Sequence, residues 1–163
     1  MSDPLETLEN ITYNELDEGD SATFTRTLSE DELVLFAAVS GDVNPVHLDS
    51  AFAAESMFKE RIAHGMWSGS LISAALATVM PGPGTIYLEQ SLTFKRPVRL
   101  DDTLTVSLTV VRKEPKNRVV LQCDVRNQNN QVVVTGEAKV IAPTEKVSLK
   151  KPRLPKITIE DQS

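Results

Sequence analysis

The spacing of apolar residues along the chain changes from a helical period in the first half to strict alternation in the second. Alternation over residues 21–28 predicts a first strand. The capping box Ser29-Glu30-Asp31-Glu32 then opens a segment whose apolar residues recur every three or four positions, which predicts a helix over residues 30–39. Residues 50–56 are rich in alanine and predict a short helix. An uncharged stretch over residues 65–79 is too long for a strand and predicts a helix buried on all sides.

From Thr85 onward the apolar residues alternate, which predicts four strands. The turn Gln128-Asn129-Asn130 joins the last two as a hairpin. The alternating residues of the four strands are Ile86, Leu88, Leu92 and Phe94; Leu104, Val106, Leu108 and Val110; Val119, Leu121, Cys123 and Val125; and Val132, Val134, Ala138 and Val140. One uncharged helix followed by antiparallel strands predicts an α+β fold, in which a curved antiparallel sheet wraps around a long central helix.

The chain length of 163 residues predicts one domain with a single sizeable core. Residues 1–16 show no clear period and are interpreted as an N-terminal arm that packs on the domain formed by residues 17–142. In residues 143–163, lysine and arginine alternate with Pro152 and Pro155, which is typical of an extended basic arm or linker.

Charge and cysteine content exclude several classes of protein. The net charge is −6 with both signs mixed along the chain, which argues against a nucleic-acid partner because a phosphate backbone requires a basic face. The single Cys123 has no intramolecular disulfide partner and lies in an alternating stretch, so we expect a buried, inert thiol. The sequence shows no metal-ligand spacing, and we expect no metal and no cofactor.

Two stretches bear on cellular location. Residues 1–10 are acidic and lack an apolar run, so we expect no secretory signal and a cytoplasmic protein. The uncharged interval over residues 62–88 contains too many serine, glycine, threonine and proline residues for a membrane span, and we expect no membrane association.

Candidate chemistry is concentrated in the segment FAAVSGDVNPVHLDSAFA, residues 36–53. Its Ser40-Gly41 and Asn44-Pro45 pairs break a helix, so we expect Asp42 and His47 on an ordered bend rather than on a helix face. A rigid proline between an acid and a base lowers the entropy of holding both on one small target such as a water molecule. Asn44 is interpreted as a residue that fixes the loop through a local Asx-turn bond.

These residues resemble a known family signature. An aromatic residue, two spacers and an aliphatic residue precede Ser-Gly-Asp-x-Asn-Pro-aliphatic-His, and a small residue follows, as in the (R)-specific enoyl-CoA hydratases, the MaoC-like or hydratase 2 family. The matching positions are Phe36, Val39, Ser40, Gly41, Asp42, Asn44, Pro45, Val46, His47 and Ala53. The blocks Ile62-Ala63-His64-Gly65-Met66, with Ser73 in the helix that follows, and Gly84-Thr85-Ile86-Tyr87-Leu88 are also similar to that family.

The resemblance implies a hot-dog fold, a homodimer, and (R)-specific addition of water to a trans-2-enoyl-CoA to give an (R)-3-hydroxyacyl-CoA. It assigns water activation to Asp42 and His47, points to the backbone N–H of Gly65 as the donor to the thioester oxygen, and matches Ser73 to a serine of the active site. A carboxylate and an imidazole on one bend are able to bind the same water, and the free N–H groups at a helix start are able to stabilise an oxyanion.

Each candidate residue also has a structural explanation. Asp42 could cap the chain after a helix, and His47 could be a hydrogen-bonded core histidine. The other histidine, His64, adjoins a helix start, where capping would account for it. Ser73 could be selected by close packing alone, and Trp67 could fill the core rather than wall an acyl pocket.

Substrate and partner contacts are less defined by the sequence. Lys95, Arg96 and Arg99, or the basic tail, are candidates for binding the phosphates of CoA, although a solvated basic edge explains them equally well. Alternatives to the hydratase are a 3-hydroxyacyl-acyl-carrier-protein dehydratase or thioesterase of the same fold, and a non-catalytic acyl-CoA binding domain. The chain also resembles the hydratase domain found upstream of phosphate acyltransferase domains in fusion proteins.

Overall fold

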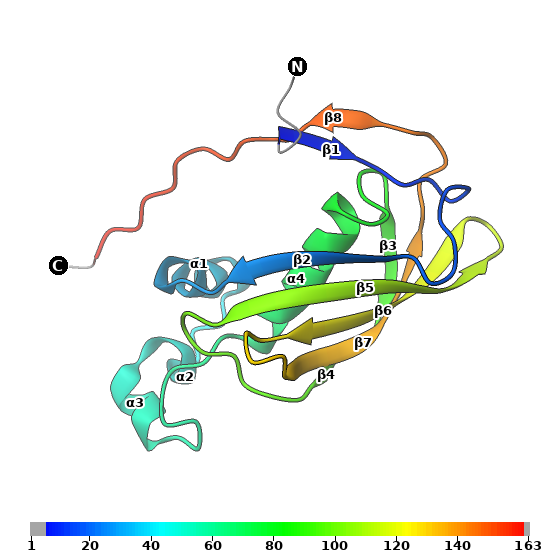
Figure 1. Cartoon of the computed structure of the whole chain (residues 1–163). Helices are drawn as coiled ribbons and strands as arrows, with labels where there is room; N and C mark the ends of the chain where they lie inside the picture. Colours follow the sequence, from blue (N-terminus) through cyan, green and yellow to red (C-terminus); the bar gives the residue numbers. More distant parts are fainter. Residues whose placement is uncertain (1–5, 162–163) are drawn as a thin grey trace.

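Six strands form the main antiparallel sheet of the computed structural model, which describes residues 6–161 (Figure 1). The sheet order is β2-β5-β6-β7-β3, and β4 pairs with β7. The strands are β2 (Ser21–Thr27), β3 (Ile86–Gln90), β4 (Thr93–Phe94), β5 (Thr103–Glu114), β6 (Arg118–Arg126) and β7 (Val132–Ile141). The helices are α1 (Glu30–Ser40), α2 (Pro45–Leu48), α3 (Ser50–Glu55) and α4 (Gly65–Thr78).

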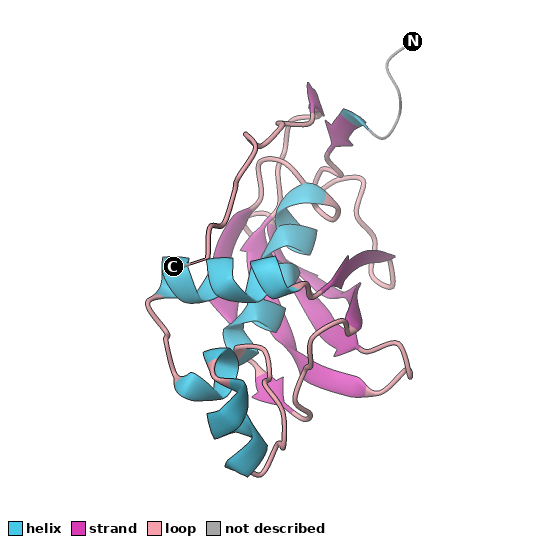
Figure 2. Ribbon diagram, turned by 90° about the vertical axis from the view of Figure 1, so that its left-hand side faces the viewer, coloured by secondary structure: helices cyan, strands magenta, loops and turns pink. Residues whose placement is uncertain are grey.

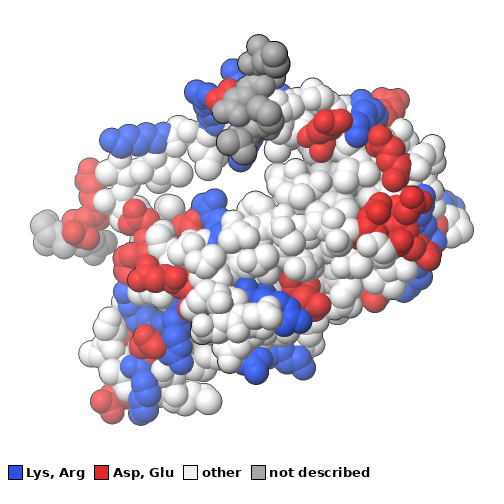
Figure 3. Space-filling view, viewed as in Figure 1, with Lys and Arg blue, Asp and Glu red and all other residues white. Residues whose placement is uncertain are grey.

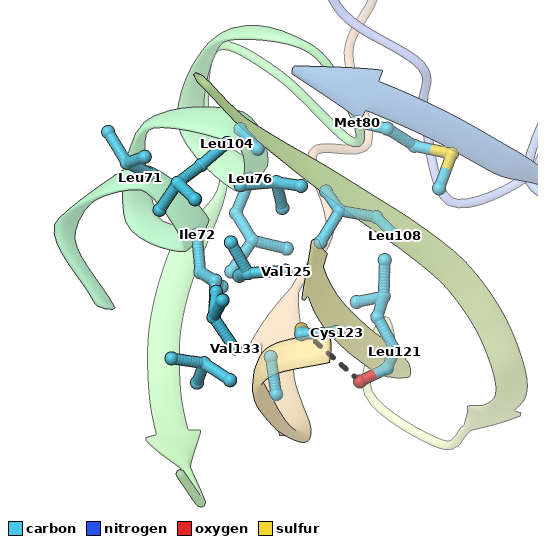
Figure 4. Packing of buried hydrophobic residues seen from close by; sticks show 14 of the residues in the cluster. Leu71, Ile72, Leu76, Met80, Leu104, Leu108, Leu121, Cys123, Val125 and Val133 are labelled. Atoms are coloured by element: carbon cyan, nitrogen blue, oxygen red, sulfur yellow. Dashed lines mark hydrogen bonds between the residues drawn. The ribbon is translucent and has the colours of Figure 1, made fainter. Parts of the chain in front are cut away.

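The central helix α4 packs against one face of the sheet (Figure 2). Leu71, Ile72 and Leu76 of α4 are buried together with the inward-facing residues of β5 and β6. Figure 4 shows these side chains in one cluster with Leu104, Leu108 and Val125 from the sheet. Burying one such side chain contributes about 1.5–3 kcal/mol, so this contact is a main source of stability. The predicted α+β arrangement, a sheet around a long central helix, is confirmed.

The capping box at the start of α1 forms only in part. Ser29 Oγ accepts a hydrogen bond from the Glu32 N–H at 3.2 Å, as expected. The Glu32 carboxylate, however, binds Arg26 on β2, with 2.6 Å between Arg26 Nε and Glu32 Oε1. The glutamate therefore ties α1 to the sheet instead of returning to the helix start, because a guanidinium is a stronger partner than a backbone amide.

The prediction of one continuous strand from Ile86 to Phe94 is wrong. The segment forms β3 and β4, with a register shift between Tyr87 and Glu89 and a break at Ser91. The reason is that the backbone at Ser91 crosses very close to β7. A Cβ atom on Gly136 of β7 would lie 1.8 Å from the Ser91 carbonyl oxygen. The Ser91 backbone therefore bends over a position that only glycine permits.

Two short segments, one near each end of the described chain, pair as strands. Strand β1 (Thr7–Glu9) pairs antiparallel with β8 (Ser148–Lys150), and Figure 1 shows this two-stranded ribbon beside the main sheet. Asn10 is buried and its side chain bonds the Glu145 carbonyl at 2.8 Å and the Val147 N–H at 3.0 Å. The tail that the sequence predicted to be an extended basic arm or linker therefore has its first part paired with the N-terminal arm, which supplies a strand and a buried amide for it.

Charged residues of both signs lie on the face of the molecule seen in Figure 3. Figure 3 shows basic and acidic residues interspersed on the viewed face, with a wide uncharged area between them. Within residues 6–161, no helix has both the length and the apolar character that crossing a membrane requires. Cys123 is fully buried, and burial raises the pKa of its thiol to about 12.

Candidate active site

Asp42 is carried on a tight turn that follows α1. Gly41 ends the helix with φ of 75°, a left-handed conformation that disfavours other residues, and its N–H bonds the Ala37 carbonyl at 2.9 Å. Asp42 comes next, with its side chain half exposed. Its Oδ1 accepts a hydrogen bond from the Asn44 N–H at 3.1 Å, which leaves Oδ2 directed toward His47.

His47 lies in one turn of helix, α2, so its predicted place on a bend is wrong. Asn44 caps this turn with its side-chain oxygen, which accepts from the Val46 N–H at 3.2 Å, and Pro45 occupies the first helical position. Proline fits there because the first helical N–H has no intrahelical partner and the ring already fixes a helical φ. The pair of chain breakers therefore starts a helical turn instead of extending the loop.

The hydrogen bonds of His47 define which ring nitrogen carries the proton. Its Nδ1 lies 2.7 Å from the carbonyl oxygen of Ile62. Because a carbonyl oxygen only accepts, Nδ1 carries the proton, and in the uncharged ring Nε2 presents a lone pair. Nε2 lies 3.8 Å from Asp42 Oδ2. That distance exceeds a direct hydrogen bond and leaves one water able to reach both atoms.

His64 joins the same group, although the sequence offered capping as its explanation. It is the N-cap residue of α4 but makes no side-chain capping bond, so that explanation is wrong. Its ring stacks on His47 with centroids 3.8 Å apart, and its Nε2 donates to the Asp42 carbonyl oxygen at 2.8 Å. His64 Nδ1 is buried and has no hydrogen-bond partner among the described residues.

Gly65 opens α4 directly after His64 and lines a cavity of about 330 Å³. A Cβ atom on Gly65 would lie 2.9 Å from the Phe94 ring, so glycine keeps this end of the cavity open. The first N–H groups of a helix lack intrahelical acceptors, and the His64 side chain does not cap them. The geometry therefore offers backbone donors at the wall of a cavity that His64 also lines.

Ser73 lies two turns further along α4, in a second cavity of about 740 Å³. Phe36 and Phe94 also line this cavity. Asp42 and His47 are among the lining residues of neither cavity, and His64 is the member of their group that lines the first. Phe94 thus borders both cavities, and Phe36 packs against His64 with ring centroids 5.1 Å apart.

Trp67 is buried in the core and lines neither of these two cavities, but it lines a third cavity of about 310 Å³ together with Phe36. Its role as a wall of the acyl pocket therefore stays a prediction.

The three basic candidates for CoA contacts separate into two groups. Lys95 and Arg96 line the cavity that contains Gly65. Arg99 instead forms an ion pair with Glu60, and its guanidinium also donates to the Phe58 carbonyl at 3.3 Å. Arg96 donates to the Val132 carbonyl at 2.8 Å, which leaves Lys95 the less engaged of the two cavity residues.

Sequence reasoning missed two groups that shape the site. The Ile62 carbonyl sets the His47 tautomer, and a backbone acceptor leaves no trace in residue type. Phe94 was interpreted only as an alternating strand residue, yet it borders both cavities because the strand breaks before it. Phe36 did have a signal, since it is the aromatic residue that begins the signature.

The family model described as "MaoC like domain" matches residues 13–133. A curated (R)-specific enoyl-CoA hydratase of Rhodospirillum rubrum is 44% identical over 131 residues, covering 80% of this chain and 91% of the relative. The chain therefore belongs to the MaoC-like domain family, and the family expected from its signature is confirmed.

Solved structures agree with this assignment. The unliganded R-hydratase PhaJ1 from Pseudomonas aeruginosa matches with a TM-score of 0.92 and 58% identity, covering 94% of this chain and 99% of that structure. The (R)-hydratase from A. caviae, described as involved in PHA biosynthesis, matches with a TM-score of 0.76 and 42% identity, covering 78% and 98%. The hot-dog fold implied by the resemblance is confirmed.

Proposed function

We propose that the protein is an (R)-specific enoyl-CoA hydratase, which adds water to a trans-2-enoyl-CoA and forms an (R)-3-hydroxyacyl-CoA. The observation that carries this proposal is the gap of 3.8 Å between His47 Nε2 and Asp42 Oδ2. Similarity to the R. rubrum and P. aeruginosa hydratases supports the hydro-lyase class, the CoA thioester substrate and the (R) configuration.

Asp42 and His47 activate the water in this proposal. The water donates one hydrogen bond to Asp42 Oδ2 and the other to His47 Nε2, which fixes its remaining lone pairs toward the substrate. As the water oxygen bonds C3 of the enoyl thioester, one of these two groups takes its proton. The group that took the proton then donates it to C2, so OH and H are added across the double bond, both side chains return to their starting state and no redox cofactor is needed.

Gly65 supports the charge that develops on the thioester oxygen. As C3 is attacked, electron density moves through C2 to this oxygen, which becomes enolate-like. The uncapped N–H groups at the start of α4 line the neighbouring cavity and are suited to donate to it. Removing one such donor in other acyl enzymes costs roughly 100-fold to 1,000-fold in turnover.

The two cavities provide room for the rest of the substrate. The cavity with Gly65 and Lys95 suits the thioester and a phosphate-bearing carrier, because a lysine ammonium attracts phosphate. The larger cavity with Ser73 and Phe94 is mostly apolar in its lining and suits the acyl chain. Asn44 acts through the loop, by capping the turn that carries His47.

A homodimer completes the proposal. Strand β3 is at the edge of the main sheet, and Ile86 and Leu88 on it are 56% and 40% exposed. An exposed apolar edge strand favours pairing with a second copy of the strand. Sedimentation analysis tests this, and a monomer at assay concentration would contradict it. The cytoplasmic location expected from the sequence stays a prediction, as does a fused acyltransferase domain.

The test of function is loss of the conjugated enoyl absorbance with crotonyl-CoA and with a medium-chain trans-2-enoyl-CoA, followed by chiral analysis of the product. We expect rapid loss and the (R)-alcohol. The same assay is run in parallel with the same acyl groups attached to an acyl carrier protein. Turnover only on the carrier protein would favour the dehydratase alternative, and no turnover on either carrier would contradict the proposal.

A further inference from the structure

We propose that Asp42, His47 and His64 form a binding site for a divalent transition-metal ion such as Zn²⁺, and that metal bound there inhibits the enzyme. One ligand atom from each side chain lies within 4.8 Å of the others. Metal binding follows from this geometry whatever the reaction is, whereas inhibition rests on the proposed function.

Both histidines present the correct nitrogen for a metal. His47 donates its Nδ1–H to the Ile62 carbonyl, so Nε2 carries the free lone pair. His64 donates its Nε2–H to the Asp42 carbonyl, so Nδ1 carries the free lone pair. Histidines that ligate metals in proteins show this pattern, in which the second ring N–H is held by a carbonyl or carboxylate.

The buried lone pair of His64 is the second, independent observation. His64 is 3% exposed, and its Nδ1 has no hydrogen-bond partner among residues 6–161. A buried polar atom without a partner costs free energy, so the site contains an unsatisfied acceptor. A cation that binds Nδ1 removes that cost.

A single water does not satisfy this group of atoms. With both rings uncharged, His47 Nε2, His64 Nδ1 and Asp42 Oδ2 are three acceptors, whereas one water donates two hydrogen bonds. A divalent cation accepts electron pairs from all three at once. A water held between Asp42 and His47 therefore leaves His64 Nδ1 without a partner, and a metal ion would bind that atom as well.

The ligand types and distances select the class of ion. Two imidazoles and a carboxylate with an open fourth position match Zn²⁺ better than Mg²⁺ or Ca²⁺, which prefer oxygen ligands. In tetrahedral Zn²⁺ sites with bonds of about 2.0–2.1 Å, ligand atoms lie roughly 3.3 Å apart. His47 Nε2 and Asp42 Oδ2 are 3.8 Å apart, and the half-exposed Asp42 is free to close that difference. The two rings are stacked with centroids 3.8 Å apart and planes 26° apart, so they must also fan open for both lone pairs to meet one ion.

Metal in this position occupies the lone pairs that the hydratase uses to hold and deprotonate water. Zn²⁺ is therefore expected to compete with catalysis and to be reversed by a chelator. The chain has only these two histidines, and its single cysteine is fully buried with a raised pKa, so strong competing sites are few.

The experiment uses tag-free, chelator-treated full-length protein and two metal probes. Zn²⁺ is titrated by calorimetry without substrate, and Co²⁺ is titrated by visible absorption, where a low-coordinate nitrogen and oxygen site gives an intense band. We expect one ion per chain in both. We also expect hydration of crotonyl-CoA to fall as Zn²⁺ occupancy rises and to return on adding EDTA.

Two variants test the ligands, and a third is the control. We expect Asp42→Asn and His64→Gln each to weaken Zn²⁺ binding at least about tenfold. Loss of a residue that only hydrogen-bonds a metal ligand already weakens binding by about that much. Asp31→Asn removes the same charge from an exposed acid in the first turn of α1 and leaves affinity unchanged. Absence of stoichiometric binding by wild-type protein, or equal affinity in all three variants, would overturn the proposal even if hydration is confirmed.

Discussion

Asp42→Asn is the sharpest test of how the site activates water. The change keeps Oδ1 as an acceptor for the Asn44 N–H and replaces only Oδ2, the atom directed at His47 Nε2. An amide N–H in that position donates and does not accept, so the water loses one of its two acceptors. Loss of a general base costs about 100-fold to 10,000-fold in turnover. This corresponds to about 3–5 kcal/mol in the activation barrier.

Folding should be almost unaffected by the same change. Asp42 is half exposed, and the hydrogen bond that its side chain accepts is one an asparagine also accepts. We therefore expect the free energy of unfolding to change by less than about 0.5 kcal/mol, as for surface substitutions in general. Turnover of crotonyl-CoA is measured beside urea unfolding, with Asp31→Asn as the charge-matched control. A folded variant that keeps more than about a tenth of wild-type turnover would refute the assigned role of Asp42.

Two further predictions concern the fold. Gly136→Ala places a Cβ atom against the Ser91 carbonyl and should destabilise the protein by about 3 kcal/mol or more. In the matched change Gly69→Ala, the new Cβ meets only side-chain tips, so helix propensity offsets the crowding and urea unfolding should shift little. Equal effects would contradict the close crossing. The Cys123 thiol, with its pKa raised to about 12 by burial, should stay unmodified by a disulfide reagent near neutral pH until urea unfolds the chain. Rapid labelling of folded protein would show that the thiol is accessible.

The sequence predicted the layers of the fold better than it predicted the details of the strands. The strong alternation over β5, β6 and β7 reports one face against a core. The prediction that α4 is buried on all sides is wrong, because Met66, Ser70 and Ala77 are exposed and only the side of the helix toward the sheet is buried. The absence of charged residues did not separate the two cases. The break between β3 and β4 has no such signal, because its cause is a glycine on a distant strand. The pairing of β1 with β8 was missed for a similar reason, since both strands are short and a buried asparagine secures them.

The candidate site was predictable where it depends on residue type and not where it depends on backbone geometry. Asp42, His47 and Gly65 were identified from the signature and the residues that follow it. The helical turn around His47 was not, because Asn44 and Pro45 both break a preceding helix and begin a new one. The position of His64 was also hidden, since a histidine before a helix is ordinarily explained by capping.

The two segments that carry the site orient each other. His47, in the first segment, donates a hydrogen bond to the Ile62 carbonyl of the second. His64, in the second segment, donates one to the Asp42 carbonyl of the first. Each histidine therefore uses one nitrogen to bind the backbone of the opposite segment and directs the other nitrogen at the shared site. Because two hydrogen bonds and a ring stack cross the same gap, neither lone pair turns away without breaking a contact of the other histidine. Preorganisation of this kind favours water activation, whereas a metal ion that binds both lone pairs has to open the ring stack first.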